Sequence, residues 1–73
     1  MDKQEFLKKL KETLQSDNEL NMDTILDDLE EWDSLGMMTT AVFLEKEFGF
    51  KTTVNDLIAY QTVQELYNKV QSF

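Results

Sequence analysis

The stretch whose residues could do chemistry is EEWDSLGMM, Glu30 to Met38, which holds a serine between an aspartate and a leucine. A serine nucleophile needs a positioned base, and the chain contains no histidine. There is no G-x-S-x-G elbow, and no S-x-x-K pair because Met37 stands three residues after Ser34. No residue is therefore predicted to be catalytic, and the chain is not expected to be an enzyme. Ser34 can still be a helix N-cap or a residue that another enzyme modifies.

Oxygen-bearing side chains upstream of Ser34 alternate along the chain, as the ligands of an EF-hand calcium loop do. They are Asp17, Glu19, Asn21 and Asp23. Such a loop needs glycine at its sixth position and usually glutamate at its twelfth, where this chain has Met22 and Asp28. No specific metal site is predicted, although the acids should attract divalent cations through their charge. The absence of cysteine and histidine also argues against disulfides, thiolate catalysis and the commonest zinc ligands.

The net charge of −8 disfavours nucleic acid and anionic membranes as partners. Between residues 17 and 33 there are eight acids and no base: Asp17, Glu19, Asp23, Asp27, Asp28, Glu30, Glu31 and Asp33. This run is either a solvated loop or a segment that steers basic partner enzymes, and the sequence leaves both open. No apolar run approaches the about 20 residues of a membrane span, and the charged start MDKQEFLKKL is unlike a signal peptide. A cytoplasmic location is expected.

Composition predicts an all-α fold in one small domain covering residues 1–73, expected to be a monomer. The chain has no proline and only two glycines, whereas strand-rich folds usually need more chain breakers. Helical spacing predicts a first helix over residues 3–16, with Asp2 as its N-cap. A second helix is predicted from Ser34 to Phe48, begun by Asp33 or Ser34 as N-cap and ended by Gly49.

A short third helix within residues 51–60 and a last helix within residues 61–73 complete the prediction. Thr53 with Asp56, and Thr62 with Glu65, have the spacing of N-terminal caps. Leu57 and Ile58 are expected to turn inward. Residues 20–32 are ambiguous, since helically spaced apolar residues compete with a high density of acids, and a loop pinned by those residues is as good a prediction. The apolar residues are Met22, Ile25, Leu26, Leu29 and Trp32.

The second helix is apolar on more than one side. One side must face the core, and the other, with Leu35, Val42 and Met38, should stay near the surface as a docking patch. The motif W-DSLG, the helix end LEKEFGF and the capped last helix at TVQEL together resemble the acyl carrier protein family, which includes peptidyl and D-alanyl carrier domains. The resemblance covers essentially the whole chain. It implies a small four-helix bundle, with three main helices, one short helix and a long loop before the second.

The resemblance implies that Ser34 carries 4′-phosphopantetheine, moved from coenzyme A onto Ser34 Oγ by a phosphopantetheinyl transferase. A helix N-terminus offers free amides and a favourable dipole to the anionic phosphodiester of that group. Its thiol would hold acyl or aminoacyl groups as thioesters for acyl-loading and acyl-processing enzymes with basic docking patches. The pathway would be fatty-acid, polyketide or other specialised biosynthesis. The tryptophan before DSL and the few acids of the second helix favour a discrete carrier of a specialised pathway.

The resemblance also assigns roles to residues around Ser34. Asp33 would cap the helix and contact the transferase, Leu35 would be gripped by partners, and Gly36 would keep space open around the arm. The full docking set is Asp33, Leu35, Gly36, Met38, Val42 and Glu45. The residues expected to shield an acyl chain are Met37, Ala41, Leu44, Ile58 and Leu66. For the Met37–Met38 pair, core filling is a more common role than forming an acyl pocket. Trp32 is expected to anchor the loop.

Two other hypotheses remain open at the level of sequence. The chain could be an unmodified acidic helical module that docks a basic partner through its charge and its second helix. It could also have the carrier fold without the modification. Neither hypothesis requires Ser34 to be more than a helix cap.

Overall fold

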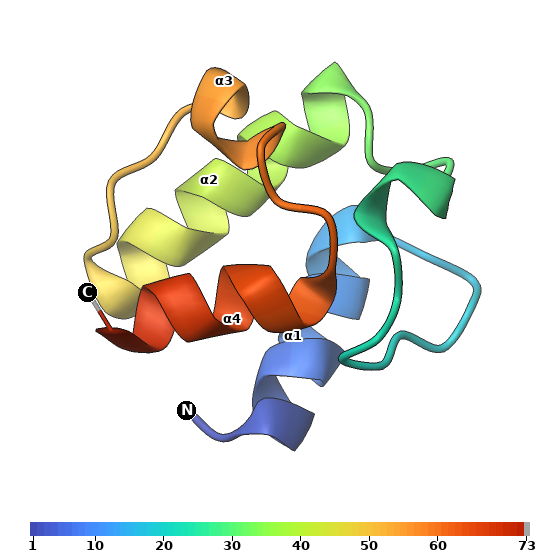
Figure 1. The fold of residues 1–73 in the computed structure, drawn as a ribbon, viewed down its shortest axis with the longest axis horizontal. Coiled ribbons are helices and arrows are strands. Elements are labelled where there is room, and N and C mark those ends of the chain that lie inside the picture. Colours follow the sequence, from blue (N-terminus) through green and yellow to red (C-terminus); the bar gives the residue numbers. More distant parts are fainter. Residues whose placement is uncertain (73) are drawn as a thin grey trace.

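The computed structural model describes residues 1–72, which form an all-α bundle of four α-helices, three long and one short (Figure 1). The elements are α1 (Lys3–Leu14), a 3-10 turn η1 (Leu26–Asp28), α2 (Ser34–Phe48), α3 (Val54–Leu57) and α4 (Val63–Ser72). The predicted fold class is confirmed. Phe73, which the prediction placed in the last helix, lies outside the described residues. Within residues 1–72 no helix is both long and apolar enough to cross a membrane.

Helix α1 begins where the sequence predicts, because Asp2 accepts a hydrogen bond from the Glu5 amide at 2.8 Å. It ends at Leu14, two residues earlier than predicted. Gln15 adopts a left-handed conformation with φ 57°, and its amide and that of Ser16 donate to carbonyls of the last turn. Ser16 therefore belongs to the turn after the helix.

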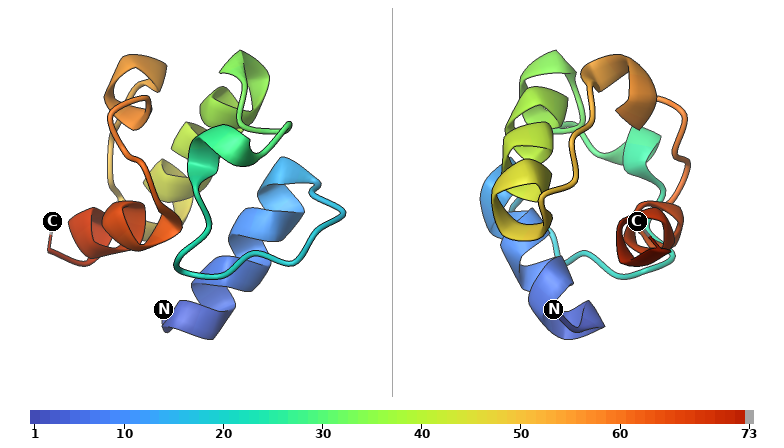
Figure 2. Two further views of the ribbon diagram at one scale, coloured as in Figure 1. Left: turned by 45° about the vertical axis from the view of Figure 1, so that its right-hand side comes forward. Right: turned by 90° about the vertical axis from the view of Figure 1, so that its left-hand side faces the viewer.

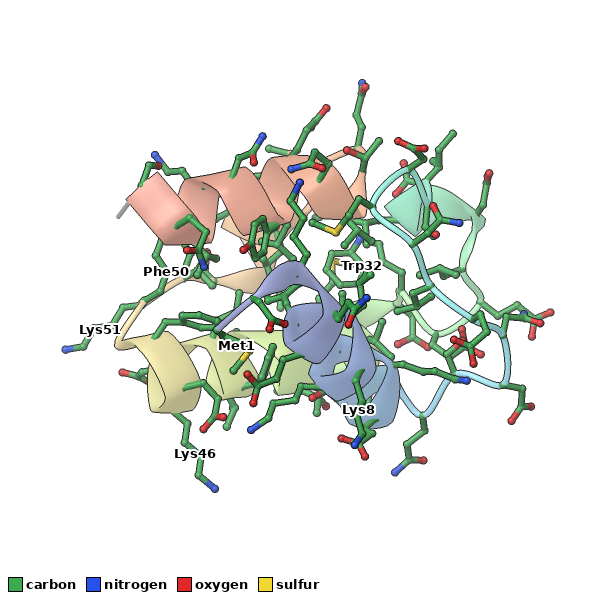
Figure 3. The ribbon with its side chains drawn as sticks, turned by 90° about the horizontal axis from the view of Figure 1, so that it is seen from below. Met1, Lys8, Trp32, Lys46, Phe50 and Lys51 are labelled. Carbon is green, nitrogen blue, oxygen red and sulfur yellow. The ribbon has the colours of Figure 1, made fainter. Side chains whose placement is uncertain are left out.

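The core lies between α1, α2 and α4 and contains the buried faces of all three helices. Phe6 on α1 is its centre, fully buried and in ring contact with Phe43, Phe48 and Tyr67. Figure 3 shows Trp32 reaching into the interior from the loop, whereas Lys8, Lys46 and Lys51 extend outward. The core residues are Phe6, Leu10, Leu14, Leu20, Leu26, Trp32, Met37, Phe43, Leu44, Phe50, Leu57, Val63, Leu66 and Val70.

The ambiguous segment before α2 is a loop with one 3-10 turn, and the helical alternative is wrong. Its backbone is extended at Ile25, which forms an antiparallel bridge with Thr62. Hydrogen bonds tie residues 22–26 to the N-terminal end of α4: Leu26 to Gln61 at 2.8 Å, Val63 to Thr24 at 3.1 Å and Gln64 to Met22 at 2.9 Å. Figure 2 shows this passage beside α4. Because neighbouring side chains of an extended segment point in opposite directions, Leu26 is buried while Ile25 is 49% exposed.

The third and fourth helices begin at the predicted caps. Thr53 and Asp56 form a reciprocal capping box at α3. At α4 the Thr62 hydroxyl accepts from the Glu65 amide at 3.2 Å, but the Glu65 carboxylate accepts from Gln61 instead of Thr62. Leu57 is fully buried as expected. The inward orientation expected of Ile58 is wrong.

We expect salt or Mg²⁺ to raise the melting temperature. Of the eight acids in residues 17–33, only Glu19 has an ion-pair partner within residues 1–72, the Lys11 ammonium at 2.7 Å. The remaining like charges repel one another, and counter-ions screen that repulsion. If screening raises the free energy of unfolding by about 1 kcal/mol, the melting temperature of a domain of this size rises by about 4–8 °C. Fluorescence of Trp32, the single tryptophan, can follow the transition; a melting temperature unaffected by either salt would contradict the expectation.

A second prediction concerns the ion pair that links α1 to α2. Lys9 Nζ lies 2.8 Å from Glu47 Oε1, and this hydrogen bond and charge hold the pKa of the Glu47 carboxyl below its usual range. The same contact raises the pKa of Lys9. A lowered carboxyl pKa stabilises the fold above the pKa of the unfolded chain, and this stabilisation is lost as pH falls through the folded value.

Glu47→Gln should therefore lower the melting temperature slightly at neutral pH and leave it unchanged below the Glu47 pKa. The effect is small because both side chains are partly exposed, 38% for Lys9 and 28% for Glu47. Glu45→Gln is the matched control, since it removes the same charge from the same helix at a residue that forms no ion pair within residues 1–72. Equal responses of the two variants at every pH would contradict the prediction.

Candidate functional site

The site is built at the N-terminus of α2, where Asp33 and Ser34 have separate positions. Asp33 is the N-cap: its backbone is extended, and its Oδ1 accepts a hydrogen bond from the Gly36 amide at 2.8 Å. Ser34 is the first helical residue, and its side chain is exposed. Of the two N-caps that the sequence allows, Asp33 is confirmed and Ser34 is wrong, because the Asp33 carboxylate accepts from the Gly36 amide in the first turn. The Ser34 hydroxyl therefore takes no part in capping the helix.

Gly36 is buried on the inner side of α2, which overturns the expectation that it keeps space open around Ser34. A Cβ atom at this residue would overlap the backbone carbonyl of Glu31 and lie 3.2 Å from Leu14 Cδ2. Gly36 thus allows the loop before α2 to approach the helix and α1. It is not accessible as a docking residue.

The outer side of α2 carries an apolar ridge, which we define as Leu35, Met38 and Val42. Their side chains are 71%, 56% and 65% exposed. Glu45, further along the same helix, is also exposed. The expected surface exposure of these residues is confirmed, and their role in docking stays a prediction. Thr40 of the same helix is completely buried, and its hydroxyl donates to the Gly36 carbonyl at 2.8 Å.

The residues predicted to shield an acyl chain do not share one environment. Leu44 and Leu66 are fully buried in the core and Met37 is 9% exposed, whereas Ala41 is half-buried. Ile58 is 58% exposed, because α3 is a single turn that ends at Leu57 and presents the next residue to solvent. An acyl chain could contact Leu44 and Leu66 only after core side chains move.

A cleft of about 300 Å³ lies beside the start of α2, on the side that faces α1. Asp33, Leu35 and Thr39 form one wall, and Thr13 and Gln15 form the other. Sequence reasoning missed Thr13 and Gln15, because only the folded chain brings the end of α1 next to Ser34. None of the five predicted acyl-shielding residues lines this cleft.

Trp32 anchors the loop as expected, with 7% of its surface exposed. Its indole N–H is buried and has no hydrogen-bond acceptor within residues 1–72. Its side chain therefore anchors the loop through apolar packing, and burial of the N–H without an acceptor opposes that anchoring.

Comparison with known families decides what this site belongs to. The model of a phosphopantetheine attachment site matches residues 4–70. The chain belongs to this family. Searches among curated proteins and among solved structures give no match.

Domains of the phosphopantetheine attachment-site family are carriers and not enzymes, and they bear a covalently attached 4′-phosphopantetheine group. Membership implies interaction with a phosphopantetheinyl transferase and with acyl-processing enzymes. It also agrees with the lack of a histidine base, because a carrier needs no catalytic residue of its own.

The residues at the start of α2 fit this group. The Ser34 hydroxyl is exposed, and the amides of Ser34 and Leu35 have no acceptor within residues 1–72. These two N–H groups and the helix dipole favour a phosphodiester at this position. Within residues 1–72 no cluster of three or more histidine, cysteine, aspartate or glutamate side chains could hold a metal ion.

Proposed function

We propose that Ser34 is the attachment residue, and that the chain carries acyl or aminoacyl groups for enzymes of a fatty-acid, polyketide or other specialised biosynthetic pathway. One observation carries the proposal: in a chain matched by the family model over residues 4–70, Asp33 caps α2 and leaves the Ser34 hydroxyl exposed. When attached, the group supplies a terminal thiol on which acyl groups are held as thioesters.

The chain's own residues would position and present that group. Asp33 fixes the first turn of α2, so that Ser34 is held on a rigid helix end instead of a mobile loop. Ser34 needs no base within the chain, because the transferase would supply it. Leu35, Met38 and Val42 offer apolar contact to partners close to Ser34. Glu45 adds one charge to that surface.

An acyl chain long enough to need shielding would first meet residues at the edge of the core. Met37 and Ala41 lie on α2 between the exposed ridge and the buried Leu44, so they would be contacted before the core itself. Leu66 would be reached only with a rearrangement of α2 or α4. Ile58 would cover the entrance from outside and would not form an inner wall.

The test is an intact-mass measurement after incubation with coenzyme A and a broad-specificity phosphopantetheinyl transferase. The wild-type chain should gain the mass of one phosphopantetheine, and Ser34→Ala should gain none. Ser72→Ala is the matched control, because Ser72 is also exposed and should leave the mass gain intact. Since Asp33 and not Ser34 caps α2, the free energy of unfolding of Ser34→Ala should lie within about 0.5 kcal/mol of the wild-type value.

Two outcomes would contradict the proposal. An unmodified wild-type chain, with a transferase shown to be competent on another carrier, would favour an acidic interaction module or a carrier fold without the modification. A mass gain that persists in Ser34→Ala would place the attachment on another residue.

A further inference from the structure

The cleft beside the start of α2 is one end of a longer groove between α1 and α2. Thr13 and Thr39, which line this cleft, also line a second hollow of about 540 Å³ farther along the same two helices. The two hollows therefore meet at this pair of threonines, and we call them together the α1–α2 groove. Its walls include Thr13, Gln15, Leu35, Thr39, Val42 and Lys46.

The groove begins next to Ser34 and runs toward the C-terminal end of α2. The residues on either side of Ser34 line its first part. The Lys9–Glu47 ion pair, which bridges α1 and α2, lines its far part. Lys46 stands twelve residues after Ser34, and at about 1.5 Å per residue this is about 18 Å along the helix axis. A flexible group on Ser34 that follows the groove has this length to occupy.

The walls of the groove are mixed in polarity, and some of their polar groups are unpaired. The side chains of half-buried Thr13 and exposed Gln15 have no hydrogen-bond partner within residues 1–72. The Thr39 hydroxyl donates to the Leu35 carbonyl at 2.9 Å and can still accept a hydrogen bond. Leu35 and Val42 add apolar surface, since they are 71% and 65% exposed. A ligand that combines amides with methyl and methylene groups complements such walls.

We propose that the phosphopantetheine arm on Ser34 lies in the α1–α2 groove when no partner enzyme holds it. Beyond its phosphodiester the arm is uncharged and presents methyl groups, a hydroxyl, amides and a thiol. About fourteen covalent bonds separate the serine oxygen from the thiol, and they span about 18 Å when extended. The arm therefore reaches from Ser34 to the level of Lys46. The inference rests on the proposed function for the attachment at Ser34 and adds a resting site for the arm.

Position favours this groove over a larger hollow elsewhere on the molecule. That hollow, of about 940 Å³, lies between α3 and α4, and its lining residues all fall between Phe50 and Ser72. None of them belongs to α2 or to the loop before it, so the hollow does not begin at Ser34. The α1–α2 groove also leaves the core intact, because the arm can occupy it without displacement of Leu44 or Leu66.

The experiment uses the full chain made by chemical synthesis, with phosphopantetheine already attached to Ser34, so that it does not depend on a transferase. The thiol of the arm is methylated, and isotope labels are placed at Leu35, Thr39, Val42 and Ile58. Nuclear Overhauser effects in solution NMR should connect the unlabelled arm to Leu35, Thr39 and Val42. None should connect it to Ile58, which is exposed at the end of α3 and lines neither part of the groove.

Thr39→Trp tests the path by filling the groove where its two parts meet. Thr39 is exposed, so the larger ring should leave the fold intact and displace the arm. The Overhauser effects between the arm and Val42 should weaken more than about fivefold. Met38→Trp is the matched control, because it adds the same ring at an exposed neighbour that lines neither part of the groove. It should change these effects less than about twofold.

The outcomes separate this inference from the proposed function. An arm that contacts Ile58, or that contacts neither Thr39 nor Val42, overturns the inference. Equal weakening in the two tryptophan variants overturns it as well, once circular dichroism melting has shown that both are folded. A synthetic chain whose arm lies against Thr39 and Val42, combined with an unmodified chain that gains no mass from coenzyme A and a competent transferase, would contradict the proposed function alone.

Discussion

Gly36→Ala is expected to lower the free energy of unfolding by about 3 kcal/mol, at the upper end of the cost of overpacking. The new Cβ atom would overlap the Glu31 carbonyl, which is backbone and cannot rotate away, and would press against Leu14. Relief requires the loop before α2 to move outward, and with it the anchored Trp32. The helix propensity gained by alanine, about 1 kcal/mol, does not offset this cost. Chemical denaturation followed by Trp32 fluorescence measures the change.

Gly49→Ala is the matched glycine control, because its cost has a different cause. Nothing lies within 4 Å of a Cβ atom at Gly49, but its φ of 69° is strained for any other residue. The free energy of unfolding is expected to fall by about 1 kcal/mol. A Gly36→Ala variant as stable as the wild type would show that the loop approaches α2 less closely than the structure indicates.

Phe6→Ala is expected to lower the free energy of unfolding by about 3–5 kcal/mol. Phe6 is fully buried, and its ring centre lies 6.1 Å from that of Phe43, 6.1 Å from that of Phe48 and 5.2 Å from that of Tyr67. Its removal leaves a cavity where α1, α2 and α4 meet. A domain of 73 residues has a total stability of about 4–11 kcal/mol, so this substitution removes a large fraction of the free energy of unfolding.

Val42→Ala is the control for Phe6→Ala, because it truncates an apolar residue that the fold does not bury. Val42 is 65% exposed, and the expected change is within about 0.5 kcal/mol. Thermal melts of both variants by circular dichroism give the comparison. A small loss for Phe6→Ala would contradict the position of Phe6 at the centre of the core.

The sequence predicts the boundaries of α2 because the signals for them are local. Asp33 binds an amide three residues on, and Gly49 adopts a conformation that its lack of a side chain favours, so neither depends on the rest of the fold. The same is true of the caps of α1 and α3. The family resemblance rests on this well-determined part of the chain, and the family match over residues 4–70 confirms it.

The parts that the sequence does not predict depend on contacts between distant residues. Ile25 is exposed because the loop pairs with Thr62, which lies far along the chain, and helical periodicity contains no sign of that pairing. The role of Gly36 depends on the return of the loop to α2, and the exposure of Ile58 depends on the shortness of α3. The apolar ridge was predictable, because α2 has more apolar residues than one buried side can hold.

Because Asp33 caps α2 and Ser34 does not, residue 34 is a suitable single site for chemical labelling. Since the helix start depends on residue 33, the side chain at residue 34 can be exchanged without loss of the first turn of α2. Ser34→Cys would introduce the sole thiol of a chain that has no cysteine, at an exposed residue. Maleimide or disulfide conjugation would then install dyes, crosslinkers or synthetic cargo mimics at one defined atom, with no need for a transferase.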